Sequence, residues 1–138
     1  MIYAVIDTNV LVSALLTHNF DAATAKVVRA LLKRKFTPLY NEEILREYSD
    51  VLSRSKFNFS KHMVNTYINA IKKLGLKTLQ SHSTERFPDP KDVVFYEVAM
   101  SKADAYLVTG NTKHFPQKPI VVTPAEMVEI LIDEGLLE

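Results

Sequence analysis

Three of the sixteen acidic residues stand at positions where catalytic groups are expected. The first, Asp7, follows an apolar run at residues 2–6 that predicts a buried strand ending at the acid. In an open parallel sheet, ligands and catalytic groups collect at the carboxyl ends of the strands. Asp7 is therefore a candidate catalytic acid. The simpler alternative is that Asp7 or Thr8 only caps the next helix, and position alone does not decide between the two.

The second acid, Asp92, is singled out by helical phase. At about 100° per residue it shares a helix face with Phe95 and Tyr96, so its carboxylate is expected to point toward the sheet. Burying a carboxylate is costly unless a cation or hydrogen-bond donors compensate. The alternative role for Asp92 is to support a cap at Asp89 and the helix dipole.

Glu47 and Asn111 complete the set of candidates. Glu47 borders the apolar stripe of its predicted helix. Considered without the other acids, it is better explained as a surface residue paired with Arg46 or Arg54. Asn111 follows the apolar strand that ends at Thr109, and Gly-Asn is also ordinary turn chemistry. If the strands ending before Asp7 and Asn111 are neighbours, both turns face one crevice.

A regular alternation of strands and helices along the chain is expected to position these acids. Strands are predicted at residues 2–6, 36–40, 76–80, 105–109 and 119–122, and helices at 10–16, 22–35, 42–54, 61–74, 90–102 and 124–135. Residues 57–60 are expected to form a turn. The alternation predicts a three-layer α/β sandwich around a parallel sheet, built as one domain over residues 1–138.

Composition narrows the possible site chemistry. The chain has 17 basic and 16 acidic residues, so an RNA partner would have to bind a local basic patch. It has no cysteine, which excludes thiolate zinc sites and disulfides and fits a cytoplasmic protein. No signal peptide or membrane span is predicted. Three carboxylates in one crevice would repel each other unless divalent cations lay among them, and oxygen ligands favour Mg²⁺ or Mn²⁺.

Four motifs in order resemble the PIN domain family. They are Asp7-Thr8-Asn9-Val10, the segment 41–48 that contains Glu47, the helix start Asp89-Pro90-Lys91-Asp92, and the segment 103–111 that ends in Thr-Gly-Asn. The most similar branch is that of the VapC-like toxins of toxin–antitoxin pairs. The resemblance covers nearly the whole chain, and its specificity lies in the ordered set rather than in any single motif.

The resemblance implies a five-stranded parallel sheet and a ribonuclease that uses one or two Mg²⁺ or Mn²⁺ ions. It assigns the metal ligands to Asp7, Glu47 and Asp92, with Asn9 and Thr109 as supporting hydrogen-bonding residues. Asn111 stands where the family often has a fourth acid, which puts a second metal in doubt. The implied partners are RNA, a cognate antitoxin and a second copy of the chain. Surplus apolar side chains on the helices at 22–35 and 60–74 would serve a homodimer, and core packing explains them equally well.

The residues fit two other α/β families poorly and leave one alternative function open. A receiver-like domain would need an acid after the third strand and a lysine after the fifth, and the chain has neither. A dehalogenase-type phosphatase would need a second acid where Asn9 stands. The serious alternative is a degenerate PIN module that binds RNA or protein without cleaving. Arg86, Lys113 and His114 lie in loops at the same edge, where ordinary surface charge is the favoured explanation over phosphate binding.

Overall fold

The computed structural model describes residues 1–138 and contains a five-stranded parallel sheet flanked by helices. The strands are β1 (Tyr3–Ile6), β2 (Thr37–Tyr40), β3 (Leu76–Lys77), β4 (Tyr106–Val108) and β5 (Val121–Val122). The α-helices are α1 (Thr8–Leu16), α2 (Ala23–Leu32), α3 (Glu42–Leu52), α4 (Lys61–Leu74), α5 (Val93–Met100) and α6 (Pro124–Asp133). Three short 3₁₀ helices complete the list: η1 (Ser55–Phe57), η2 (Pro90–Asp92) and η3 (Thr112–His114).

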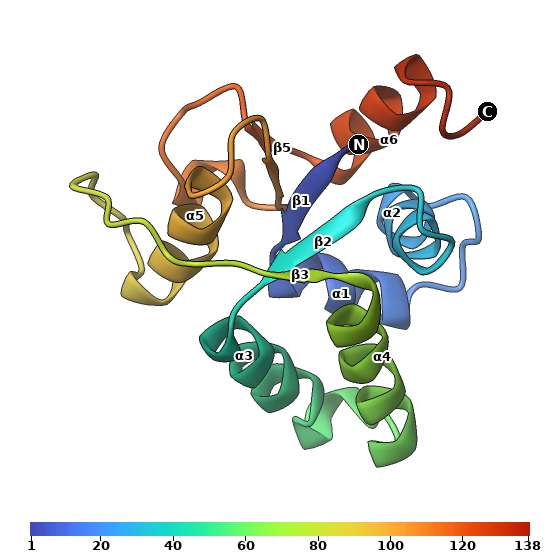
Figure 1. Cartoon of the computed structure of the whole chain (residues 1–138). Coiled ribbons are helices and arrows are strands. Elements are labelled where there is room, and N and C mark those ends of the chain that lie inside the picture. The colour runs from blue at the N-terminus through green and yellow to red at the C-terminus, as the bar shows by residue number, and fades with distance from the viewer.

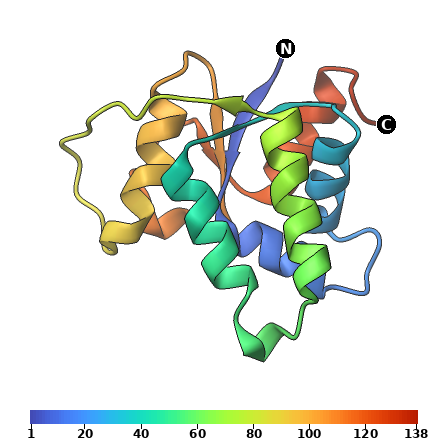
Figure 2. The same cartoon turned by 60° about the horizontal axis from the view of Figure 1, so that its bottom comes forward.

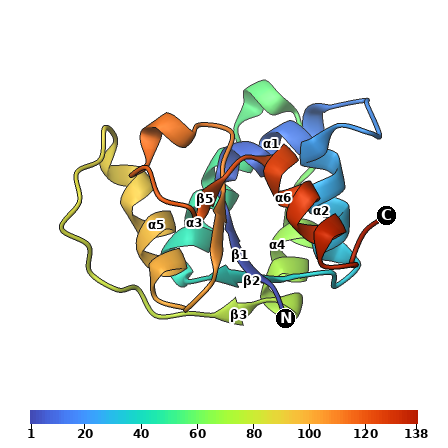
Figure 3. The same ribbon diagram turned by 90° about the horizontal axis from the view of Figure 1, so that it is seen from above.

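The sheet has the strand order β3-β2-β1-β4-β5, with every pair parallel. The chain builds outward from β1 in one direction and then returns to add β4 and β5 on the other side. The strand order therefore reverses between β1 and β4, which is the place where open α/β sheets bind ligands. The views in Figures 1 and 3 show α3 and α5 on one side of the sheet and α2, α4 and α6 on the other. The predicted three-layer α/β fold is confirmed.

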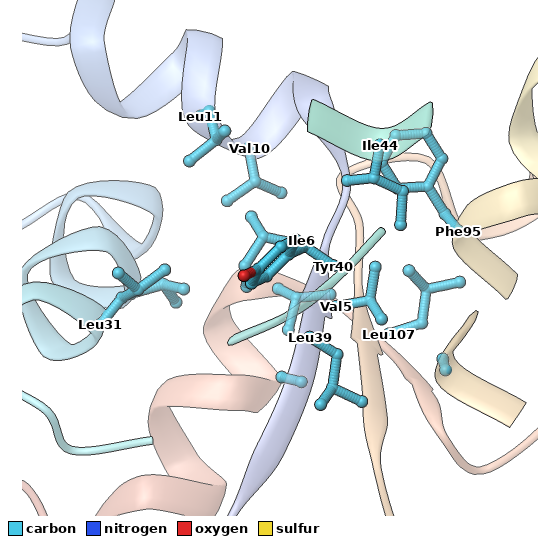
Figure 4. Close-up of a cluster of buried hydrophobic side chains, with 14 of the residues drawn as sticks. Val5, Ile6, Val10, Leu11, Leu31, Leu39, Tyr40, Ile44, Phe95 and Leu107 are labelled. Carbon is cyan, nitrogen blue, oxygen red and sulfur yellow. The ribbon is translucent and has the colours of Figure 1, made fainter. Parts of the chain in front are cut away.

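The core consists of apolar side chains from both faces of the central strands. Val5 of β1, Leu39 of β2 and Leu107 of β4 are fully buried and lie between the two layers of helices (Figure 4). Leu31 of α2 and Phe95 of α5 approach them from opposite sides. Burial on both faces explains why these strands read as continuous apolar runs rather than as alternating patterns.

Several predicted boundaries are wrong. The first helix begins at Thr8 rather than residue 10, and 3₁₀ helix η1 occupies part of the expected turn. The third strand pairs over only Leu76–Lys77, because the chain then leaves the sheet to run beside α5 (Figure 2). The helix expected at 90–102 is a 3₁₀ turn followed by the shorter α5. No helix combines the length and apolar character needed to cross a membrane.

A buried carboxylate on α5 anchors the loop that follows β3. Glu97 is only 5% exposed and accepts hydrogen bonds from Gln80 Nε2 at 2.7 Å and from the backbone amide of Ser83. The backbone amide of Ser81 donates to the Glu97 carbonyl at 3.3 Å. Because this loop leads directly into η2, Glu97 fixes the approach to Asp92. No sequence pattern predicts this role of Glu97.

A hydrogen bond from α3 fixes the end of β1. The fully buried Tyr48 hydroxyl donates to the backbone carbonyl of Ile6, one residue before Asp7. Burial, and the nearby charge of Asp7, raise the pKa of Tyr48 well above its usual value, so the hydroxyl keeps its proton.

The change Tyr48→Phe is expected to lower the free energy of unfolding by about 1–2 kcal/mol, because a buried carbonyl loses its donor. Urea unfolding measures this directly. Tyr67→Phe is the matched control, since the Tyr67 hydroxyl makes no hydrogen bond. A loss equal in both variants would contradict the role given to Tyr48.

Candidate metal centre

The candidate site lies where β1 and β4 end side by side. Ile6 pairs with Val108 in the parallel ladder, so the next residues, Asp7 and Thr109, meet at the same edge of the sheet. The Asp7 backbone amide donates to the Val108 carbonyl at 2.9 Å and extends the pairing by one step. The register of two strands therefore decides that Asp7 faces the turn after β4.

Asp7 is 6% exposed, and the residues that follow the two strands hold its carboxylate. Its Oδ2 accepts a hydrogen bond from Thr109 Oγ1 at 2.8 Å and another from Asn9 Nδ2 at 3.2 Å. Asp7 occupies the N-cap position of α1, yet its side chain makes no capping hydrogen bond. The capping explanation for Asp7 is therefore not supported, and both hydrogen bonds from these side chains go to Oδ2.

Burial raises the pKa of Asp7 above its usual value. The hydrogen bond from Thr109, the backbone amide of Thr8 and the imidazole of His114 act in the opposite direction. The charge of Glu47 adds to the increase. Hydrogen-bond donors thus stabilise the ionised form of Asp7, whereas burial and the charge of Glu47 destabilise it.

Asp92 stands at the junction of η2 and α5 and also fails to cap its helix. The cap of η2 is Asp89, which accepts a hydrogen bond from the Lys91 amide at 3.0 Å. Oδ2 of Asp92 is buried without a hydrogen bond and lies 3.5 Å from His114 Nδ1. Desolvation, and then the charge of Asp7, raise the pKa of Asp92 to about 6.

Glu47 is half-buried on α3 and makes no hydrogen bond or ion pair with another side chain. Its charge raises the pKa of both Asp7 and Asp92, which places the three carboxylates within electrostatic range of each other. The ion pair expected with Arg46 or Arg54 is absent.

Thr109 and Asn111 lie on the turn after β4, and Asn9 faces this turn from the start of α1. Asn9 Oδ1 accepts from the Gly110 amide at 3.2 Å, which ties the start of α1 to this turn. Thr109 Oγ1 accepts from the Asn111 amide at 3.0 Å while donating to Asp7. The exposed Asn111 side chain itself makes no hydrogen bond.

Sequence reasoning undervalued two residues of this region and missed one. His114 was assigned to ordinary surface charge, but it lies beside Asp92, whereas Arg86 and Lys113 are exposed and unpaired. Thr8 is 6% exposed, and its hydroxyl has no hydrogen-bond partner. Tyr48 was not among the predicted site residues. The polar ends of these three side chains depend on tertiary packing, which no local pattern reveals.

In this structure no group of three His, Asp or Glu side chains is close enough together to bind one metal ion directly. The donor set nevertheless fits Mg²⁺ or Mn²⁺. Mg²⁺ is usually bound through one or two carboxylates and keeps several waters, so direct contact by three side chains is not required. Asp92 Oδ2, buried without a hydrogen-bond donor, is the kind of atom that a cation or its water would satisfy.

Comparison with known families gives one result. The family model described as PIN domain matches residues 3–113, a span that contains β1 through β4 and all four candidate site residues. No curated protein matches the chain.

The change Asp92→Asn is expected to raise the melting temperature by a few degrees at pH 7.5 without divalent cations. The pKa of Asp92 rises from 3.8 to about 6 on folding, so the folded state binds this proton more tightly than the unfolded chain does. The contribution of Asp92 to stability is therefore full below about pH 4 and is lost as the pH rises through 6. The difference between variant and wild type should shrink toward pH 4.

Differential scanning calorimetry across this pH range makes the test, with Asp50→Asn, an exposed acid on α3, as control. A variant no more stable than wild type at pH 7.5 would contradict the electrostatic strain assigned to Asp92.

Proposed function

Because the chain belongs to the PIN domain family, whose members are typically nucleases, we propose that it is a metal-dependent ribonuclease that hydrolyses RNA phosphodiester bonds. One observation supports this most. Asp7 and Asp92 both precede helices, where Asp commonly serves as a cap, yet neither caps and each has a raised pKa. Acidic residues with shifted pKa values that lie together at the edge of a sheet are typical of functional sites.

We assign the cation to Asp7, Glu47 and Asp92, with the Asn111 amide oxygen as a weaker further donor. When bound, Mg²⁺ or Mn²⁺ would activate a water and offset the charge that develops on the phosphate. Asn111 adds no negative charge where relatives often have an acid, so we propose one well-held ion rather than two.

The residues around the acids have separate tasks in this proposal. Thr109 and Asn9 bind Asp7 Oδ2, and Oδ1 receives no hydrogen bond from another side chain. Tyr48 fixes the backbone before Asp7, and Glu97 fixes the loop before Asp92. His114, half-exposed beside Asp92, is placed to donate a hydrogen bond to a phosphate oxygen.

A second candidate function is a PIN module that binds RNA or a protein without cleaving. Two observations favour it: Asn111 replaces an acid, and the side chains do not form a ready three-ligand site. The three acids themselves argue against it, because burying them has an energetic cost and serves no purpose in a passive module.

The role of toxin in a toxin–antitoxin pair is a further proposal that rests on the ordered motifs. A neighbouring reading frame that encodes a small DNA-binding protein would support it. Homodimerisation is proposed through the region where α1, α2 and α4 meet. There Phe20 is 70% exposed and Leu32 is 39% exposed, and both line a shallow apolar cavity with Tyr67.

Purified wild-type protein is expected to cleave single-stranded or structured RNA in the presence of Mg²⁺ or Mn²⁺. The change Asp7→Asn should lower the rate at least a hundredfold, because it removes a charged ligand from the centre of the site. Gel analysis of end-labelled RNA measures both, with added chelator as a second control. Equal cleavage by the two proteins would indicate a contaminating nuclease, and intact RNA with both would favour the binding module.

A further inference from the structure

A cavity of about 520 Å³ opens beside the candidate metal centre, between α1, α3 and η1. Its walls include Thr8, Asn9, Val12 and Leu16 of α1, Val51 of α3 and Phe57 of η1. Its volume lies within the range of small-molecule sites, about 300–1,000 Å³. Nothing in the mechanism above uses it.

The cavity is continuous with the acidic edge. Asn9 forms part of its wall and also donates to Asp7 Oδ2. Val51 lies four residues beyond Glu47 on the same face of α3, a rise of about 6 Å. A group that fills the cavity is therefore the immediate neighbour of whatever Asp7 and Glu47 hold.

One wall carries polar groups that a ligand can reach. Asn9, Ser13 and Thr17 line it beside the apolar residues of α1, and Ser13 is exposed. Polar groups that a ligand shuts off from water need new hydrogen-bond partners. A ligand with hydrogen-bonding edges would supply them, whereas an aliphatic side chain of a protein partner would not.

The opposite wall offers an aromatic ring with a cation close by. Phe57 is half-buried and stacks on Phe59, with ring centroids 5.6 Å apart and planes inclined by 16°. Lys56 Nζ lies 5.1 Å from the centroid of Phe57, and neither Lys56 nor Arg54 forms an ion pair. Aromatic rings beside basic side chains are the usual means of holding unpaired bases of single-stranded nucleic acid.

We propose that this cavity binds the base of the nucleotide next to the cleaved phosphodiester, with Phe57 against its face and Ser13 and Thr17 at its polar edge. The proposal rests on the ribonuclease function proposed above and adds a base-binding subsite to it. A base has both the flat apolar face and the polar edge that these walls require. The cleaved RNA must then be unpaired at this position.

The direct test uses an RNA cleaved at one defined position and a series in which each flanking nucleotide in turn is an abasic ribose. For wild type, one abasic position is expected to lower kcat/KM about tenfold, a typical effect of losing one stacked base. Phe57→Ala should cleave the parent RNA about tenfold more slowly and show no further loss at that position. Phe57→Leu, which keeps apolar bulk without a ring, should behave in the same way.

Leu79→Ala is the control. Leu79 is also an exposed apolar side chain, at 87%, but it lies outside this cavity. This variant should retain the wild-type response to the abasic series. An abasic effect of the same size in wild type and Phe57→Ala, or no effect at any position, would overturn the proposal.

A binding measurement separates this proposal from the nuclease function itself. In protein with ¹³C-labelled methyl groups and without added metal, adenosine and uridine 5′-monophosphate should shift the signals of Val12, Leu16 and Val51. Ribose 5-phosphate, which lacks a base, should not. Equal shifts with ribose 5-phosphate, or none with the nucleotides at millimolar concentration, would overturn the base subsite even if RNA is cleaved. Nucleotide-specific shifts without RNA cleavage would support the subsite and count against the nuclease.

Discussion

The parallel pairing of β1 with β4 is the constraint on which the candidate site depends. The register that places Ile6 beside Val108 also places Asp7 beside Thr109, and one hydrogen bond of 2.8 Å joins the two side chains across the sheet. A shift of one residue in this register would turn Asp7 to the other face of the sheet. Asn9 adds a second link, because it contacts both Asp7 and Gly110. The site is thus assembled by backbone pairing between segments about a hundred residues apart.

The same arrangement creates an electrostatic conflict. Burial raises the pKa of Asp7 and of Asp92, the charge of Asp7 adds to the increase at Asp92, and the charge of Glu47 adds to both. A protein selected for stability alone would have neutral residues here. Tyr48 and Glu97 hold the backbone on either side of the conflict, which keeps the acids together despite their repulsion. A divalent cation would turn this repulsion into attraction, which is the physical basis of the proposed function.

Much of the architecture was predictable because buried parallel strands leave a clear mark in the sequence. The apolar runs before Asp7 and Gly110 marked β1 and β4, and strand alternation with helices predicted the three-layer sheet that the structure confirms. Strand β3 was overestimated, because its length depends on pairing with β2 rather than on its own composition. The environment of Glu97 was missed because α5 is buried nearly all round, so helical periodicity gave no contrast between its faces. His114 and Thr8 likewise acquire their surroundings only when the turns after β4 and β1 meet.

Mn²⁺ titration by isothermal calorimetry is the most direct test of a cation site formed by Asp7, Glu47 and Asp92. Wild type is expected to bind one Mn²⁺ per chain in a saturable way. Asp7→Asn should weaken this binding at least tenfold while the folded structure is retained. No binding at millimolar Mn²⁺, or equal binding by wild type and Asp7→Asn, would contradict it.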